Sequence, residues 1–488
     1  MYSGKTLLAT VLLAVPLVEA QAPLNVEQST GFNSSFTLST SQIEAANLSS
    51  TAALNINVAI NFDRSQLANG GPAEDSFYEL PPLSGTPIPG TLLKVQEFTN
   101  ASSFVIPPNT ALSRILYTTT NFNGTVIPAS AFILWPFTPK KFQAGSASTK
   151  APAVIWTHGT EGFFASAGPS THRALWYGHE GPFTLALAGY AVVAPDYAGL
   201  GIHKSWDGSK IPHQYLMSQT SGHDALYAFQ ASLEAFPDTL DERFVVIGHS
   251  QGGGVSWGVA EVLEAKGDDK FKGLVKGYLG TIAVSPTTDA FIGKIGFILP
   301  WIGMILPSIF PDFDISTWLT PLGIARTKLL QEVEGGIAVS TQLFLSGDKI
   351  IQDDYDKTWY VDAYGKLANA GRKAFKGPLL VIHGTEDYYI PENATAATVQ
   401  ATCEVVPGGD LEYLVVNGTW HVPTLDATRQ IWLKWIEDRF EGRALEKTGC
   451  VKSSLESFLP LERYQATGNS FPQFAGSPEF SYQVPLGL

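Results

Sequence analysis

Short apolar runs rich in β-branched residues recur along the chain, and stretches with helical spacing of apolar positions separate them. The apolar runs predict strands at residues 114–120, 126–136, 153–156, 191–194, 244–248, 278–284, 379–383 and 411–416. The helical stretches cover residues 223–235, 252–265, 393–403 and 427–440. Strands that are apolar throughout and alternate with helices are typical of a mostly parallel sheet with helices on both faces. We therefore expect an α/β fold.

One long segment, residues 286–376, interrupts this alternation. Within it, residues 295–311 carry no charged side chain. A transmembrane helix is one alternative, but Pro300 and Pro307 interrupt the stretch, which is also short for a span. Buried core is a second alternative. We favour a helical cap over a binding cleft, because a large insertion at the carboxyl end of a sheet strand lies where ligands bind. The residues of this stretch that we expect to contact substrate are Phe297, Trp301 and Ile302.

The two ends of the chain differ from the middle. Residues 1–5 carry one cation, residues 6–18 are apolar, and small residues precede Gln21, so residues 1–20 are predicted to be a secretory signal peptide. A membrane anchor is the alternative, but the run is shorter than the roughly 20 residues of a span. Residues 21–90 form an N-terminal extension in which residues 41–67 could hold a helix. Residues 441–488 form a C-terminal tail.

Composition excludes several classes of protein. The chain has 488 residues, is 44% hydrophobic and 11% aromatic, and can therefore bury a large core instead of remaining disordered. The net charge of -14 and the absence of a long basic run argue against nucleic-acid binding. The histidines lack metal-ligand spacing and no dinucleotide fingerprint is present, so we expect no metal and no cofactor.

Glycosylation signals and cysteines agree with export. Six Asn-x-Ser/Thr acceptor sites predict surface loops of a secreted glycoprotein, at Asn33, Asn47, Asn100, Asn123, Asn393 and Asn417. The chain has two cysteines, Cys403 and Cys450, and in an oxidising compartment we expect them to form a disulfide. Two buried free thiols are the alternative.

The strongest local signal is Gly248-His249-Ser250-Gln251-Gly252, a G-x-S-x-G pattern. It follows an apolar strand and begins a helical stretch, which is the context that a nucleophile elbow requires. Small residues at positions 248 and 252 allow the neighbouring backbone to pass close by. We expect Ser250 to be a nucleophile; a Gly-rich turn with a structural serine is the alternative.

A serine nucleophile needs a base, and the base needs an orienting acid. In hydrolases built on this elbow the acid and then the histidine follow the serine along the chain. Two histidines lie downstream, His383 and His421. The consistent assignment is Asp387 as acid and His421 as base. Glu386 is the alternative acid, and His383 is expected to be structural.

The oxyanion hole should combine the amide of Gln251 with a second amide from an earlier loop between a strand and a helix. The loop after residues 153–157 begins His158-Gly159-Thr160. We place the second donor at Thr160, with Gly159 as the alternative. We expect His158 to be held by hydrogen bonds in the loop without transferring protons.

These residues resemble the α/β-hydrolase superfamily, and more narrowly the fungal and bacterial secretory lipases and related carboxylesterases. The resemblance covers residues 89–440, roughly two-thirds of the chain. Beyond the elbow, Asp387 and His421, the stretches that carry it are Pro89-Gly-Thr-Leu-Leu, Tyr117-Thr-Thr-Thr-Asn-Phe-Asn-Gly, Val193-Ala-Pro-Asp-Tyr-Ala-Gly-Leu-Gly and His213-Gln-Tyr-Leu. The loop Thr157-His-Gly-Thr-Glu-Gly-Phe-Phe departs from the family pattern, as does the small number of cysteines.

The resemblance implies an α/β-hydrolase fold with its core at residues 91–285 and 377–440. The cap, residues 286–376, would follow the sixth core strand. It also implies a secreted serine hydrolase that cleaves carboxylic esters with a hydrophobic acyl or alcohol part, acting at a lipid interface or on soluble esters and without a stable membrane span. An acyltransferase using the same triad is one alternative. A non-catalytic binding protein on a hydrolase fold is a second, and a fluorophosphonate probe that failed to label Ser250 would favour it.

Overall fold

The computed structural model describes residues 35–83, 85–143, 149–265, 267, 269–292 and 296–464. The predicted signal peptide at residues 1–20, the acceptor site at Asn33 and residues 465–488 of the tail lie outside the described residues.

A ten-stranded sheet forms the centre of the molecule, in the order β1-β2-β3-β5-β4-β6-β7-β8-β9-β10. Neighbouring strands are antiparallel from β1 to β5 and parallel from β5 to β10. The strands are β1 (Leu92–Gln96), β2 (Ala111–Thr120), β3 (Val126–Trp135), β4 (Ala151–Thr157), β5 (Ala191–Pro195), β6 (Leu240–His249), β7 (Tyr278–Val284), β8 (Leu379–Gly384), β9 (Leu411–Val416) and β10 (Cys450–Leu455). All eight predicted strands are confirmed, and the mostly parallel α/β sheet is confirmed with them. Strands β1 and β10 were not predicted.

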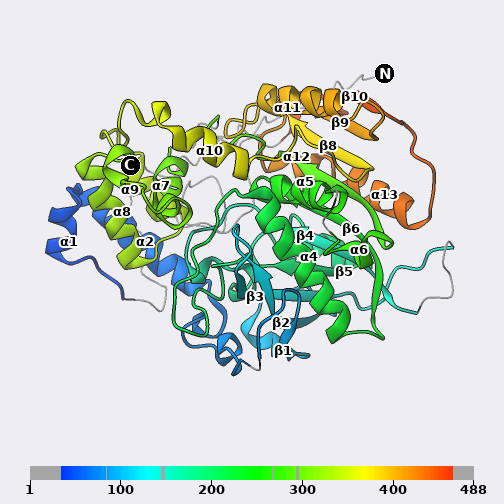
Figure 1. The fold of residues 1–488 in the computed structure, drawn as a ribbon, viewed down its shortest axis with the longest axis horizontal. Coiled ribbons are helices and arrows are strands. Elements are labelled where there is room, and N and C mark those ends of the chain that lie inside the picture. The colour runs from blue at the N-terminus through cyan, green and yellow to red at the C-terminus, as the bar shows by residue number, and fades with distance from the viewer. Residues whose placement is uncertain are drawn as a thin grey trace, which may run out of the picture.

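Helices cover both faces of this sheet (Figure 1). Helices α4 (Ser218–Ala235) and α5 (Gln251–Glu264) pack on one face, where side chains such as Val246 and Ile155 contact them. Helices α3 (Pro182–Leu187) and α13 (Arg429–Phe440) pack on the other face against Val245 and Val154. Alternate residues of β4 and β6 therefore contribute to opposite layers, which explains why these strands are apolar throughout.

Strand β4 lies between β5 and β6, so the chain moves to one side of β4 and then crosses to the other. In open α/β sheets the crevice at the carboxyl ends of strands that diverge in this way is where ligands bind. The loop after β4 begins at His158 and the turn after β6 contains Ser250. The topology therefore brings the predicted oxyanion loop and the predicted nucleophile to the same edge of the sheet.

Between β7 and β8 the chain forms the cap helices α7 (Ile298–Ile309), α8 (Pro321–Val333), α9 (Ile337–Phe344) and α10 (Trp359–Ala368). In this sheet the preceding strand is the seventh and not the sixth, because β1 adds a strand at the start. Helix α7 extends through Pro300, in its first turn, and Pro307, near its end, instead of being broken by them. No described helix is both long and apolar enough to cross a bilayer.

The N-terminal extension contributes to the cap. Helix α2 (Ser50–Ser65) buries Ile56 and Phe62 in the same apolar cluster as helices α7, α8 and α9. The buried guanidinium of Arg326 on α8 donates hydrogen bonds to the carbonyls of Ala46 and Asn47, at 3.0 and 3.1 Å. In Figure 1 the blue helices α1 (Thr40–Ala45) and α2 accordingly lie beside α8 and α9. The cap is therefore assembled from two distant parts of the chain.

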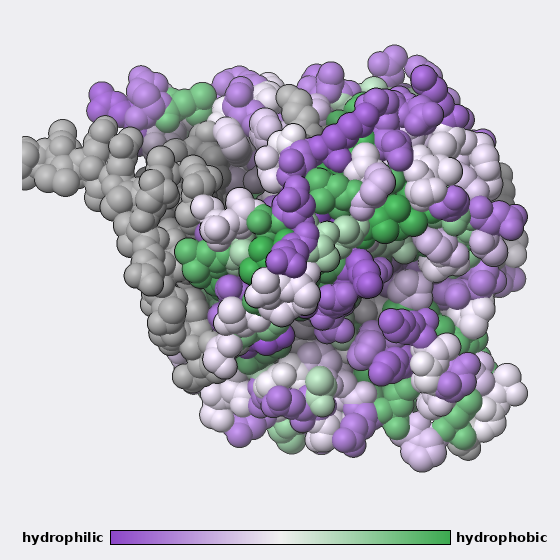
Figure 2. Space-filling view, turned by 90° about the vertical axis from the view of Figure 1, so that its left-hand side faces the viewer, coloured by the Kyte–Doolittle hydropathy of each residue, from purple (hydrophilic) through white to green (hydrophobic). Residues whose placement is uncertain are grey.

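Figure 2 views the molecule from the side where α1, α2 and α8 lie. Hydrophobic side chains gather in a band across this face, between hydrophilic ones. Exposed apolar side chains of the cap and extension include Leu54, Leu345 and Trp359. This side of the molecule therefore combines apolar and polar surface.

Cys403 and Cys450 form the predicted disulfide, which joins helix α11 (Glu392–Val405) to strand β10. Strand β10 pairs in parallel with β9 at the edge of the sheet. Part of the tail therefore belongs to the central sheet.

Candidate active site

Ser250 lies at the sharp turn between β6 and α5. Its backbone has φ 59° and ψ −121°, a left-handed conformation that is costly for a residue with a side chain. The Ser250 amide donates to the carbonyl of Val284 at 3.0 Å, and the Thr287 amide donates to the Ser250 carbonyl at 3.1 Å. These two bonds from the end of β7 and the segment after it hold the strained turn in place.

Both glycines of the pattern are required by close backbone contacts. A Cβ atom at position 248 would collide with the Thr157 side chain and the Gly252 carbonyl, and one at position 252 would collide with the Thr157 carbonyl. The end of β4 therefore passes directly against the turn. This packing agrees with the role that the sequence predicts for the two small residues.

His421 and Asp387 are in direct contact. His421 Nδ1 lies 2.6 Å from Asp387 Oδ2, and both residues are buried. Asp387 follows β8 and His421 follows β9, so neighbouring strands deliver the pair to the carboxyl edge of the sheet. The His421 ring lies 4.6 Å from the ring of His249, the residue before Ser250. The predicted acid and base are therefore in contact, and the base lies beside the residue that precedes the predicted nucleophile. Glu386, the alternative acid, is exposed.

Asp387 is surrounded by donors. Its Oδ1 accepts the amides of Tyr389 and Ile390 at 3.0 and 2.9 Å, and His383 Nε2 lies 3.2 Å from its Oδ2. Burial alone would raise the pKa of Asp387, but the nearby His421 and the hydrogen bonds from both histidines hold that pKa well below its usual range. Asp387 is thus an ionised carboxylate that can orient His421 and stabilise its positive charge.

A chain of hydrogen bonds connects the loop after β4 to the first residue of α5. The Thr160 hydroxyl donates to Gln251 Oε1 at 3.1 Å and accepts from the Tyr215 hydroxyl at 3.0 Å. The Gln251 side-chain amide donates to His213 Nε2 at 3.1 Å, and His213 Nδ1 donates to the Ala198 carbonyl at 3.2 Å. Burial lowers the pKa of His213 to about 3, consistent with a neutral ring. The two predicted oxyanion residues are therefore held side by side.

Aromatic side chains of the cap contact Tyr215, at one end of this chain of hydrogen bonds. The Trp301 ring lies 5.2 Å from the Tyr215 ring and 6.0 Å from the Phe163 ring, and the Tyr364 hydroxyl donates to the Tyr215 carbonyl. Trp301, Phe297 and Ile302, the residues predicted to contact substrate, are all buried in the apolar cluster of the cap. Of these three, Trp301 contacts Tyr215, whose hydroxyl bonds Thr160.

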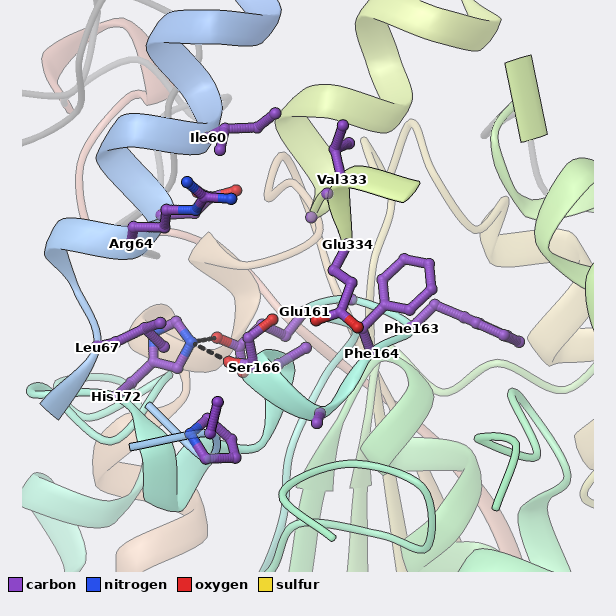
Figure 3. A pocket seen from close by; sticks show the side chains of 18 of the residues that line it. Ile60, Arg64, Leu67, Glu161, Phe163, Phe164, Ser166, His172, Val333 and Glu334 are labelled. Carbon is purple, nitrogen blue, oxygen red and sulfur yellow. Dashed lines mark hydrogen bonds and ion pairs between the residues drawn. The ribbon is translucent and has the colours of Figure 1, made fainter. Parts of the chain in front are cut away.

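A cavity of about 840 Å³ lies beside the predicted oxyanion loop (Figure 3). Its walls come from α2, from the residues that follow Thr160 and from the junction of α8 and α9. Glu161 Oε1 lies 2.5 Å from His172 Nε2, and burial raises the pKa of Glu161 to about 7. Phe163 lines this cavity and also contacts the His213 ring, at 6.1 Å. Phe163 therefore belongs both to the wall of the cavity and to the surroundings of His213, which bonds Gln251.

The described acceptor sites for glycosylation differ in exposure. Asn47, Asn100, Asn123 and Asn393 are exposed, although Asn393 lies in the first turn of α11 instead of a loop. Asn417 is half-buried and its side-chain amide bonds Glu456. Among the described residues, no three histidine, cysteine or acidic side chains cluster as metal ligands would.

Sequence reasoning did not identify Tyr215 or Tyr177 as part of the site. Tyr215 lies in the His213-Gln-Tyr-Leu stretch, which was recognised only through the family resemblance. Tyr177 lies 2.9 Å from His249 through its hydroxyl, and no motif surrounds it.

Comparison with known proteins places this arrangement in context. A profile of the alpha/beta hydrolase family matches residues 154–431, and no curated protein sequence matches the chain. The fold is similar to that of Candida antarctica lipase A in its closed state, with 16% sequence identity and a TM-score of 0.61, over 79% of this chain and 90% of that one. It is also similar to the rice cell wall degrading esterase LipA from Xanthomonas oryzae, with 18% identity and a TM-score of 0.53, over 73% of this chain and 97% of that one.

Proposed function

This chain belongs to the alpha/beta hydrolase family, and from that premise we propose that it is a secreted serine hydrolase of carboxylic esters. Ser250 is the nucleophile, His421 the base and Asp387 the orienting acid. The observation that carries the proposal is the 2.6 Å contact between His421 and Asp387 beside a serine held in a left-handed turn. A strained serine next to an oriented histidine is the arrangement that makes a weak hydroxyl nucleophilic.

Acylation follows from this geometry. The Ser250 oxygen attacks the ester carbonyl carbon while its proton passes to His421 Nε2. The carboxylate of Asp387 stabilises the imidazolium that forms, because its oxygen already accepts from Nδ1. The carbonyl π electrons move to the oxygen, and the backbone amides of Gln251 and Thr160 donate hydrogen bonds to the oxyanion that forms. When the C–O bond to the alcohol breaks, His421 returns the proton to the leaving oxygen.

Deacylation repeats the sequence with water. His421 accepts a proton from a water molecule as the water oxygen attacks the acyl carbon, and the Ser250 oxygen then leaves and recovers that proton. The carboxylic acid is released and the enzyme returns to its starting state. The chain of hydrogen bonds from Tyr215 to His213 supports the role of Gln251 and Thr160 as oxyanion donors. It fixes both residues before the negative charge develops on the substrate oxygen.

The surroundings of the site favour esters with a hydrophobic part. Trp301, Phe163 and Tyr215 pack together as aromatic side chains next to the predicted oxyanion residues, and the cap cluster to which they belong is apolar. Two structurally similar proteins are named a lipase and an esterase, which agrees with this substrate class. Export is supported by the Cys403–Cys450 disulfide and by exposed acceptor asparagines.

The test replaces Ser250 with alanine in the full chain. We expect Ser250→Ala to lower hydrolysis of p-nitrophenyl esters by at least about 10³-fold, since the covalent route is lost. A panel of acyl chains from acetate to oleate, soluble and emulsified, then defines the ester that is preferred. In parallel, mass spectrometry of the fluorophosphonate-treated enzyme should locate the label at Ser250.

Ser256→Ala is the matched control, because Ser256 lies on the same helix and its hydroxyl only bonds the carbonyls of Gly253 and Ile282. This variant should keep wild-type hydrolysis and labelling. Unchanged hydrolysis by Ser250→Ala, or a wild-type enzyme that fluorophosphonate does not label, would refute the proposed function.

A further inference from the structure

Three consecutive residues just before helix α3 adopt left-handed backbone conformations, although none of them is glycine or asparagine. The φ angles are 52° at Leu175, 26° at Trp176 and 61° at Tyr177. Each such residue costs on the order of 1 kcal/mol or more, and such strain persists only where the surroundings hold it. All three side chains are buried. We call residues 175–177 the left-handed turn.

The first contact of this turn is with the oxyanion loop. Trp176 Nε1 donates to the Gly159 carbonyl at 3.3 Å, one residue before Thr160. The Tyr177 hydroxyl lies directly under Gly159, where a Cβ atom would be 2.5 Å from its oxygen. The turn therefore supports the backbone that leads into the predicted oxyanion donor, and position 159 has no room for a side chain.

The second contact leads to the base. His249 Nδ1 lies 2.9 Å from the Tyr177 hydroxyl, and His249 Nε2 lies 2.9 Å from the His421 carbonyl oxygen. A carbonyl oxygen can only accept, so Nε2 carries the proton and Nδ1 accepts from the tyrosine. Burial lowers the pKa of His249 to about 3, which keeps this ring neutral. The order of donation is therefore Tyr177 to His249 to the His421 backbone.

The His421 carbonyl has one further described donor, the Ser285 hydroxyl at 3.2 Å. The Asp387 carboxylate fixes the far side of the His421 ring through Nδ1. The ring is thus held by Asp387 at its side chain and by His249 and Ser285 at its backbone. Removing His249 leaves the backbone of the base with a single, longer hydrogen bond.

We propose that the left-handed turn is a positioning element that sets the oxyanion loop through Trp176 and the catalytic base through Tyr177 and His249. Neither Tyr177 nor His249 contacts the reacting atoms; both act through His421. The inference rests on the proposed function, because it assigns His421 as the base. It explains why the strain at residues 175–177 is kept, since relaxing the turn would withdraw both supports together.

The experiment measures steady-state kinetics on a soluble p-nitrophenyl ester, well below the unfolding temperature of each variant. We expect Tyr177→Phe to lower kcat about tenfold and His249→Phe to lower it about 100-fold, because a displacement of the base by a fraction of an ångström to one ångström has effects of this size. KM should change by less than about twofold, because substrate binding is untouched. His249→Gln should recover kcat to within about fivefold of wild type, because its side-chain amide can donate to the His421 carbonyl.

Tyr117→Phe is the matched control. Its hydroxyl donates to the Asp224 carbonyl at 3.0 Å in a buried position on the opposite face of the sheet. This variant loses a bond of the same kind and should keep wild-type kcat and KM. A fall in kcat for Tyr117→Phe equal to that for Tyr177→Phe would mean that only general destabilisation is being measured, and would overturn the proposal.

The rate of fluorophosphonate labelling at Ser250 distinguishes a failure of the proposed function from a failure of the positioning role alone. A wild-type enzyme that is not labelled refutes the proposed function and this inference with it. A wild-type enzyme that is labelled, with Tyr177→Phe labelled and turning over at the same rate, refutes this inference alone. Tyr177→Phe removes a single oxygen atom and carries the test if His249→Phe does not fold.

Discussion

At the scale of single residues, the site depends on groups whose charge and orientation are fixed before substrate arrives. Asp387 receives four donors, and His249 and His213 are held neutral by burial while their ring nitrogens hold neighbours in place. Groups whose charge and orientation are fixed in this way do not need to reorganise during the proposed reaction.

The two neighbouring carboxylates, Asp387 and Glu386, allow the acid to be identified. We expect Asp387→Asn to lower kcat by about 10³- to 10⁴-fold, because an amide there can no longer stabilise the imidazolium. Glu386→Gln should stay within about twofold of wild type, since Glu386 is exposed. Kinetics on a p-nitrophenyl ester measure both, and a loss confined to Glu386→Gln would reverse the assignment.

Residues with a sequence motif could be predicted and residues without one could not. Ser250, Asp387 and His421 follow from the elbow and from the order of acid and histidine along the chain. Tyr177 could not be found, because a left-handed turn made of Leu, Trp and Tyr has no sequence signature. The burial of Phe297 and Ile302 in the cap also depends on partners in α2 that are distant in sequence.

At the scale of elements, burial decides which ones the sequence predicts. The eight predicted strands lie inside the sheet or at its buried side, where apolar runs are long. Strands β1 and β10 are the two edges, are only partly buried and include polar residues such as Lys94, Lys452 and Ser453, so no periodic signal marks them. Edge strands therefore depend on other contacts to stay in place.

The disulfide between Cys403 and Cys450 holds the edge strand β10 to helix α11. We expect the double variant Cys403→Ser, Cys450→Ser to lose about 3–4 kcal/mol of unfolding free energy, because the closed loop no longer restricts the unfolded chain. Amide exchange in residues 450–455 should accelerate first, since β9 is the single strand that pairs with β10 in the part of the chain that the structure describes.

Urea unfolding and hydrogen exchange measure these effects. Ser453→Ala is the control, because it alters β10 without touching the disulfide. An unchanged urea midpoint together with full protection of β10 in the double variant would contradict the expectation.

At the scale of the whole molecule, the protein buries several carboxyl groups that are not fully compensated. Burial raises their pKa values, to about 6 for Asp63 and Asp196 and to about 7 for Glu161, Glu180 and Asp224. The folded state binds these protons more tightly than the unfolded state. Their contribution to stability is therefore fully present below about pH 4, where the same carboxyls are also protonated in the unfolded chain, and is lost progressively as the pH rises from there through about 6 to 7.

Histidines oppose this trend over part of the range. Burial lowers the pKa values of His158, His203, His213 and His249, so these residues add stability as the pH rises toward 6.5. Above 6.5 they are neutral in both states and only the carboxyls and His172 still titrate. Burial is the largest effect on His172 and lowers its pKa, but the charge of Glu161, the hydrogen bonds to Glu161 and to the Ser166 carbonyl, and the charge of Asp63 together raise it by more. The stability that His172 contributes is therefore also lost with rising pH.

We therefore expect the unfolding free energy to be nearly level between about pH 4.5 and 6.5 and to fall by on the order of 2 kcal/mol by about pH 8. The unfolding free energy should also fall below about pH 4, because the unfolded chain then takes up protons at Asp387 and Asp75, whose pKa values are held below the usual range in the folded protein. Urea unfolding across this pH range measures the profile.

Glu180→Gln isolates one carboxyl in this profile. It should stabilise the protein more at about pH 8 than at about pH 5, since the glutamine resembles the protonated acid and Glu180 Oε1 has no described hydrogen-bond partner. Stability that rises between about pH 6.5 and 8, or an equal effect of Glu180→Gln at both pH values, would contradict the expectation.

The hydrogen bonds from Arg326 to Ala46 and Asn47 join positions about 280 residues apart. During synthesis, helix α2 is made long before the helices that cover its apolar side, so it must remain without its partners until two-thirds of the chain exists. A segment near the start of the chain therefore cannot reach its native position until helices α7, α8 and α9 have been made.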